Sequence, residues 1–321
     1  MAFETGSATN MADLITKLFT FAVANGWTQD QLDTGTGKAA MHRGNIYVSF
    51  RWNTTTPLNL GLYQALGYTG GNDPGTHPND SGNGAVSATN ATIDDERYVD
   101  LGNGAFPSYH FFEYDTYIHI VVERTTDIFR HFGFGSITKF GDWTGGEYCY
   151  GMHQQSGSPI DAASCYLADG LMSTAGNRER SSTLHAEGLP GQSGSSKWGE
   201  ISGFSSAPSN DTAGNSRILV NGGFRGSPVA RQFGLFAAGN SSGLIPTYPI
   251  ALWYQRLATS DVYFLGTLPD VRGVNIGLFV AKQEITIGSD TWIIFPAALK
   301  TTTSVTDRTR HMGIAYKKVT I

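Results

Sequence analysis

The side chains of this sequence that could bind a metal ion or act as nucleophiles are few and widely spaced. The chain of 321 residues contains eight histidines and two cysteines. His119 and Glu123 share one face of an expected strand, but four residues of strand separate them by about 13 Å, too far to bind one ion. Cys149 and Cys165 are too few for a disulfide framework, so we expect reduced thiols. The sequence predicts no metal site and no cofactor.

Two short motifs match catalytic patterns only in part. Residues 239–243 read G-x-S-x-G, but that pattern needs a helix directly after the serine, and the two prolines that follow exclude one. Residues 35–38 resemble a phosphate-binding loop, yet Leu32 replaces its first glycine and Ala39 its serine or threonine. A pair of acidic residues for glycoside hydrolysis stays open, because such pairs meet only in the fold. We therefore predict that the chain is not an enzyme and rank a hydrolase last among the possible functions.

The composition narrows the class of protein further. Charged residues make up 15% of the chain and the net charge is −5, against about 25% charged residues in average soluble proteins. No basic stripe is present, so specific nucleic-acid binding is not expected. No apolar stretch of about 18 residues exists, so no membrane span is expected, and the first residues do not read as a secretory signal. The 40 glycines indicate many turns, and the low charge indicates that other protein covers part of the surface.

One helix is predicted near the start of the chain. Asn10 is a suitable N-cap, and Asp13 lies in the first turn, where a negative charge favours the helix. Gly26 provides a left-handed stop after Asn25. The apolar stripe of this helix consists of Met11, Leu14, Ile15, Leu18, Phe21 and Ala22.

Most of the remaining chain is expected to form antiparallel strands. Apolar and polar residues alternate over 45–52, which is typical of a half-buried strand. Strands at 109–114 and 117–124 are separated by two residues and predict a hairpin, and residues 288–290 predict a second one. The fold class is therefore mainly β with minor α (α+β). It has an N-terminal helix packed on an antiparallel sheet, then a β-sandwich-like C-terminal region with a long extended arm.

Three regions follow from this pattern. Residues 1–153 are expected to form the helix and an antiparallel β domain, and residues 217–321 a C-terminal β region that packs on it. Residues 154–216 are rich in Gly and Ser and have few apolar anchors. A loop of that length is improbable inside a compact domain. We therefore expect an extension that neighbouring subunits order, with short strands allowed around 165–171.

Several segments of the chain resemble tailed-bacteriophage virion proteins that are usually labelled tail or structural proteins. The similarity covers the start, the middle and the end of the chain but not residues 154–215. It lies in Glu4-Thr5-Gly6, Asp13-Leu14, Leu18, Phe21, Asn25-Gly26-Trp27, residues 132–140, residues 144–148, residues 265–272 and residues 284–292. The resemblance implies a building block of the neck, tail or baseplate, and its motifs carry no catalytic residues that could be transferred to this chain.

The leading hypothesis is thus a structural virion protein, assembled in the host cytoplasm, that joins or covers adjacent tail parts. Its partners are expected to be other copies of the chain in a ring or layered assembly, and neighbouring tail or neck proteins. The alternative is a receptor- or glycan-binding tail-tip protein. Interface contacts are expected in residues 129–150 and in the arm around 173–216, because aromatic residues are preferred interface anchors. The candidate interface residues are Phe129, Phe132, Phe134, Phe140, Trp143, Tyr148, Tyr150, Trp198 and Phe204.

Overall fold

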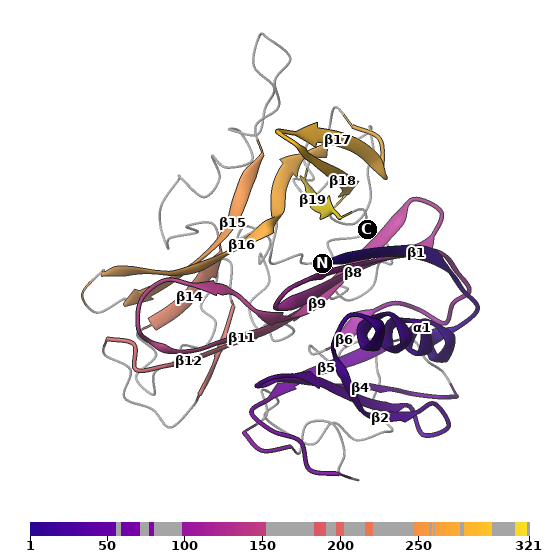
Figure 1. The fold of residues 1–321 in the computed structure, drawn as a ribbon, viewed down its shortest axis with the longest axis horizontal. Coiled ribbons are helices and arrows are strands. Elements are labelled where there is room, and N and C mark those ends of the chain that lie inside the picture. Colours follow the sequence, from indigo (N-terminus) through magenta and orange to yellow (C-terminus); the bar gives the residue numbers. More distant parts are fainter. Residues whose placement is uncertain are drawn as a thin grey trace.

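The computed structural model is built mainly from antiparallel strands, with one helix near the N-terminus (Figure 1). This confirms the predicted fold class. The strands form three sheets, which we name the central, the N-terminal and the C-terminal sheet. The structure describes residues 1–55, 59–70, 77–79, 98–151, 183–190, 197–201, 216–220, 247–256, 259, 261–276, 279–296 and 312–319.

The central sheet has seven strands in the order β1-β7-β8-β9-β11-β12-β13. Its register is antiparallel throughout, and Tyr114 pairs with Tyr117 where the β7–β8 hairpin closes. The hairpin predicted around Asp115 is therefore confirmed. The strands are β1 (Ala2–Ala8), β7 (Phe106–Tyr114), β8 (Tyr117–Thr125), β9 (Ile128–Ser136), β11 (Thr144–Gly151), β12 (Thr183–Glu187) and β13 (Trp198–Glu200).

The N-terminal sheet has five strands in chain order and contains the predicted alternating strand as β4. In β4 the side chains of Ile46, Val48, Phe50 and Trp52 are all buried, as the alternation predicted. The strands of this sheet are β2 (Thr28–Asp33), β3 (Lys38–Arg43), β4 (Ile46–Trp52), β5 (Asn59–Ala65) and β6 (Tyr98–Asp100).

The C-terminal sheet runs in the order β14-β15-β16-β19-β18-β17, and the short strand β10 (Thr138–Lys139) also pairs with β16. Ile287 pairs with Asp290 across the predicted second hairpin, where Gly288 has a φ of +64°. The strands are β14 (Ser216–Val220), β15 (Tyr248–Arg256), β16 (Val262–Asn275), β17 (Gln283–Ile287), β18 (Asp290–Pro296) and β19 (Met312–Lys318).

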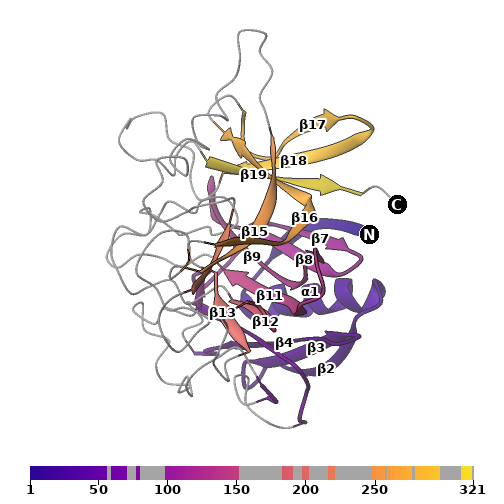
Figure 2. The ribbon, with the colours of Figure 1, turned by 90° about the vertical axis from the view of Figure 1, so that its left-hand side faces the viewer.

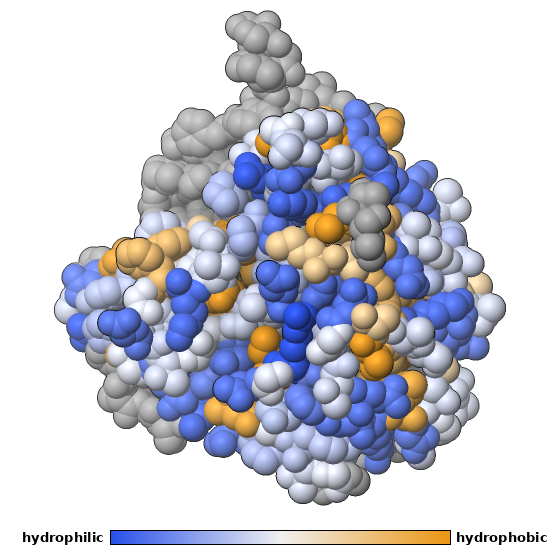
Figure 3. All heavy atoms as spheres, in the orientation of Figure 1, coloured by the Kyte–Doolittle hydropathy of each residue, from blue (hydrophilic) through white to orange (hydrophobic). Residues whose placement is uncertain are grey.

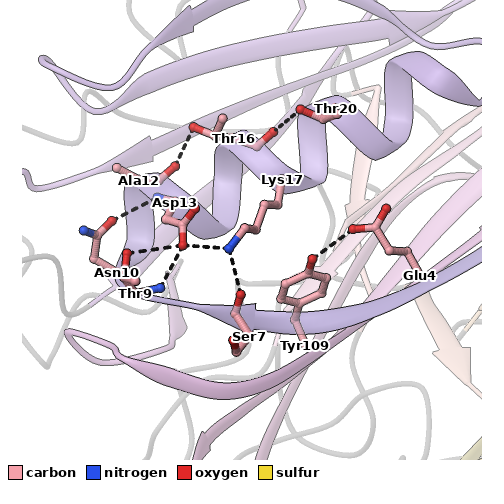
Figure 4. Close-up of polar contacts among 10 residues, drawn as sticks. All are labelled: Glu4, Ser7, Thr9, Asn10, Ala12, Asp13, Thr16, Lys17, Thr20 and Tyr109. Atoms are coloured by element: carbon pink, nitrogen blue, oxygen red, sulfur yellow. Dashed lines mark hydrogen bonds and ion pairs between the residues drawn. The ribbon is translucent and has the colours of Figure 1, made fainter.

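Helix α1 (Met11–Ala24) begins where predicted. The Asn10 side chain accepts a hydrogen bond from the backbone N–H of Asp13 at 2.9 Å, and the Asp13 carboxylate accepts one from Lys17 (Figure 4). The hydrogen bond from Lys17 lowers the pKa of Asp13. Lys17 also donates to the Ser7 carbonyl oxygen at 2.8 Å, which ties the helix to β1. Gly26 follows the helix with a φ of +88°, as its role of left-handed stop requires.

The central sheet is the middle layer, because both of its faces are buried (Figures 1 and 2). From one face of β8, Ile118, Ile120 and Val122 pack with α1 and the N-terminal sheet. From the other face, Tyr117 and Val121 pack against the C-terminal sheet. This double burial explains why β7, β8 and β9 have nearly continuous runs of buried residues instead of an alternating pattern.

The segment 154–216 needs a correction in the part that the structure describes. We expected an extension ordered by neighbouring subunits, but residues 183–187 and 198–200 form β12 and β13, the last two strands of the central sheet. Leu184 and Ala186 are fully buried in the same core as the C-terminal sheet. Ile201 then bridges to Ile218 of β14, which brings the central and C-terminal sheets together edge to edge. The stretch 165–171 lies outside the described residues.

Candidate functional site

A surface cleft of about 590 Å³ lies where the central and C-terminal sheets meet. Three chain segments line it: residues 140–144 between β10 and β11, residues 187–190 after β12, and residues 262–265 at the start of β16. Figure 3 shows apolar surface gathered over the end of the β15–β16 pair, and β16 supplies the wall 262–265 of the cleft. The volume of the cleft falls within the range of about 300–1,000 Å³ that is usual for small-molecule sites.

The rim of the cleft is held in place by hydrogen bonds within the loop 140–143. The backbone N–H of Phe140 donates to the Leu265 carbonyl at 2.8 Å, which extends the β10–β16 pairing. The Trp143 indole N–H donates to the Phe140 carbonyl at 2.9 Å and closes the loop, in which Gly141 has a φ of +86°. Lys139 donates to the Trp143 carbonyl at 2.8 Å. The loop therefore holds its aromatic side chains in a defined position.

Aromatic side chains dominate the cleft. Phe140 is 65% exposed, an unusual fraction for a large apolar side chain, and its ring lies 5.4 Å from that of Phe264. The Trp253 ring packs behind Phe264 at 4.9 Å. Val262 adds another exposed apolar side chain at the rim. Contiguous exposed apolar groups of this kind mark surfaces that contact a ligand or another protein.

Two carboxylates give the cleft its negative charge. Asp142 is exposed and makes no hydrogen bond or ion pair within the described part of the chain. Glu187 accepts hydrogen bonds from His185 at 2.7 Å and contacts the Lys197 ammonium at 3.2 Å, both through its Oε1 atom. The hydrogen bond from His185 lowers the pKa of Glu187. The cleft thus combines apolar rings with acceptors of hydrogen bonds.

His185 lies just behind the cleft, between two carboxylates. Its Nδ1 atom lies 2.6 Å from Glu147 of β11 and its Nε2 atom 2.7 Å from Glu187. Burial alone would lower the pKa of His185, but the two hydrogen bonds outweigh it and raise that pKa. Burial would likewise raise the pKa of Glu147, yet the contact with His185 lowers it. His185 thereby joins β12 to β11, and its two carboxylate partners favour its imidazolium form.

The nine predicted interface residues lie in different places. Phe140 and Trp143 line the cleft, and the centre of the Trp198 ring lies 5.2 Å from that of His185, with the two rings tilted. Phe204 lies outside the described residues. The other five are at most 1% exposed and belong to the cores of the chain itself, so their proposed contact with neighbouring subunits is corrected. These five are Phe129, Phe132, Phe134, Tyr148 and Tyr150. They are buried because the central sheet is covered on both faces.

Sequence reasoning missed a buried polar network between the central and C-terminal sheets. His131 lies 2.7 Å from the Tyr316 hydroxyl through Nδ1 and 2.8 Å from the Pro296 carbonyl oxygen through Nε2. The Tyr148 hydroxyl pairs with His119. Burial lowers the pKa of His131 to about 3 and that of His119 well below its ordinary value. Both histidines are therefore neutral, and in the sequence only their position on strands with apolar neighbours hinted at burial.

His110 lies in the same interface but differs in its contacts. Its side chain is 7% exposed and packs 4.8 Å from the Phe295 ring. Neither ring nitrogen has a hydrogen-bond partner among the described residues. Burial lowers the pKa of His110 to about 4.

These features do not form a metal centre within the described part of the chain. No group of three or more His, Cys, Asp or Glu side chains there is arranged to hold a metal ion. In the same residues, no helix is both long and apolar enough to cross a membrane. Cys149 is buried and not in a disulfide. The 239–243 motif lies outside the described residues. No family model matches the chain, and no curated protein is similar enough to match it.

Proposed function

We propose that the chain is a structural, non-enzymatic component of a tailed-bacteriophage virion, in the neck or collar, the tail or the baseplate. Copies of it associate into a symmetric oligomer that joins or covers adjacent tail parts. The segments that resemble virion proteins support this proposal, because they fall on scaffold elements: β1, α1, β9–β11, β16 and the β17–β18 hairpin. They are the parts of the chain that set its shape.

The observation that carries the oligomer is the open edge of β17. Among the described strands, β17 pairs only with β18, so its other edge has backbone donors and acceptors available to another chain. Thr286 is exposed on this strand, and Val280, 65% exposed, lies just before it. The edge strand β2 is different, because a bulge and the side chains of Asp30 and Asp33 interrupt it. Pairing of β17 with another copy extends the C-terminal sheet.

The test is the mass of the purified chain in solution and its presence in particles. Light scattering over a range of concentrations should give an oligomer for the wild type. Thr286→Lys should give a smaller species, because a lysine on an edge strand opposes strand pairing. Thr20→Lys, the same change on the exposed side of α1, is the control and should keep the wild-type mass.

Immunogold labelling of purified phage particles with an antibody against the chain gives the second measurement. Labelling at the neck, tail or baseplate is the expected result. A wild type that is monomeric at every concentration and absent from particles would contradict the proposal. An oligomer that survives Thr286→Lys would exclude the β17 edge as its contact.

A second candidate function is recognition of a receptor or glycan at the tail tip. The exposed ring of Phe140 beside the carboxylate of Asp142 favours it. A glycan array with the purified chain separates it from a purely structural role.

A further inference from the structure

The cleft between the two sheets has the properties of a ligand site that is formed before its ligand binds. The hydrogen bonds from Phe140 to Leu265 and from Trp143 to Phe140 fix its rim. The Tyr254 hydroxyl donates to the Pro190 carbonyl at 3.2 Å and fixes the opposite wall. A fixed site loses little conformational entropy on binding, so even a small ligand gains affinity there.

The chemistry of the cleft selects the ligand class. The exposed Phe140 ring offers a flat apolar surface, which suits the C–H face of a pyranose ring. Asp142 and the Oε2 atom of Glu187 have no partners among the described residues, so they can accept hydrogen bonds from hydroxyl groups. Alternating C–H faces and hydroxyl groups are the defining chemistry of a sugar. We propose that this cleft binds a neutral oligosaccharide by stacking on Phe140 and by hydrogen bonds to Asp142 and Glu187.

The charges of the cleft exclude anionic ligands. Both lining carboxylates are negative, and the cations near them among the described residues, Lys139 and Lys197, already have partners. Lys139 lies 5.2 Å from the centre of the Trp143 ring and donates to its carbonyl oxygen. Lys197 contacts Glu187. A phosphate, sulfate or uronic acid would therefore meet like charge, with no free cation among the described residues to offset it. This inference rests on the second candidate function and does not depend on oligomer formation through β17.

The test starts with an array of neutral and acidic glycans. Titrations of maltose, cellobiose, lactose and N,N′-diacetylchitobiose then follow Trp fluorescence and heat, with digalacturonate as the charged counterpart. We expect saturable binding of at least one neutral saccharide and none of digalacturonate. Phe140→Ala should weaken binding about tenfold, because burial of a phenyl ring is lost. It should fold normally, since the ring is 65% exposed.

Two further variants complete the design. Asp142→Asn keeps the shape of the rim but removes its charge, and should weaken binding of the neutral saccharide while the circular dichroism spectrum stays unchanged. Val23→Ala removes an exposed apolar side chain of α1, outside the cleft, and should leave binding unchanged. The proposal is overturned if no neutral glycan binds, or if Phe140→Ala binds as tightly as the wild type. It is also overturned if Phe140→Ala abolishes self-association, since the cleft would then hold a second copy.

Discussion

Three histidines that are buried in the neutral form should together lower the free energy of unfolding by about 6 kcal/mol when the pH falls from 8 to 5. These residues are His110, His119 and His131, which are 7%, 0% and 0% exposed. Burial lowers the pKa of His110 to about 4 and of His131 to about 3, and that of His119 falls well below its ordinary value. All three lie between the central and C-terminal sheets.

The sign and the size of this pH effect follow from the protonation of the same histidines in the unfolded chain. There each histidine takes up a proton below its ordinary pKa of about 6.5, whereas the folded chain does not, so acid favours unfolding. At pH 5 this costs about 2 kcal/mol per histidine, or about 6 kcal/mol for three. The raised pKa of His185 acts in the opposite direction, since its stabilisation is fully present below about pH 6.5. The lowered pKa values of Glu123 and Glu147 matter only below about pH 4.5.

Two substitutions separate this effect from ordinary packing. His110→Leu removes one of the three protonation sites together with two ring nitrogens that have no partner among the described residues. At pH 8 it should raise stability by roughly 1–2 kcal/mol. His131→Leu removes another site but takes a partner away from the Pro296 carbonyl, so it should lower stability at pH 8 by about 2 kcal/mol. In both variants the loss between pH 8 and pH 5 should shrink by about 2 kcal/mol.

Urea unfolding at pH 8 and pH 5, followed by tryptophan fluorescence, measures the stability of the wild type and of both variants at each pH. Equal pH dependence in the wild type and both variants would refute the reasoning, because the buried imidazoles would then not be the groups that titrate. A His110→Leu protein that is less stable than the wild type at pH 8 would refute the claim that the His110 ring nitrogens are buried without hydrogen-bond partners among the described residues.

Gly133→Ala should lower the free energy of unfolding by about 1–3 kcal/mol, because a Cβ at Gly133 would lie 2.6 Å from Tyr150 Cε1 and 2.9 Å from the Ile118 carbonyl oxygen. An unchanged urea midpoint would contradict this close packing. His185→Gln should destabilise the chain more at pH 6 than at pH 9, because only the imidazolium form, favoured at the lower pH, is charged between its two carboxylate partners. Hydrogen exchange of the β12 amides measures this destabilisation. Protection that the His185→Gln variant loses equally at both pH values would contradict the prediction.

Helices, strands and hairpins that depend on residues close together in the sequence could be predicted from the sequence alone. The Asn10 cap, the apolar stripe of α1, the alternation in β4 and the hairpin at Asp115 depend on residues close in sequence, and all of them are confirmed. The strands β12 and β13 were not predicted, because few apolar residues mark them. Their pairing with distant β11 stabilises them, and that partner cannot be identified from composition.

Only part of the candidate site could be predicted from the sequence, because its walls also depend on contacts between distant segments. The aromatic segment 129–150 was correctly identified as unusual, but strand geometry divides it. Residues of β9 and β11 point into the two cores, whereas Phe140 and Trp143 fall in the connecting loop and reach the surface. The remaining walls, 187–190 and 262–265, come from chain segments far apart in sequence. Their meeting depends on how two sheets pack, which no local pattern specifies.

The contacts that join those sheets explain how one chain can combine an open strand edge with a shaped cleft. Tyr117 donates to Asp270 at 2.8 Å and Tyr114 to the Lys317 carbonyl at 2.9 Å, so hydroxyl groups of the central sheet bind β16 and β19 at defined positions. Apolar contacts alone would allow the sheets to slide, whereas these buried hydrogen bonds are satisfied at one register only. Since the cleft takes one wall from each sheet, that register also sets its shape. The β17 edge lies three strands from β16 in the C-terminal sheet. Pairing there therefore leaves the cleft open, and assembly and saccharide binding can occur on the same copy.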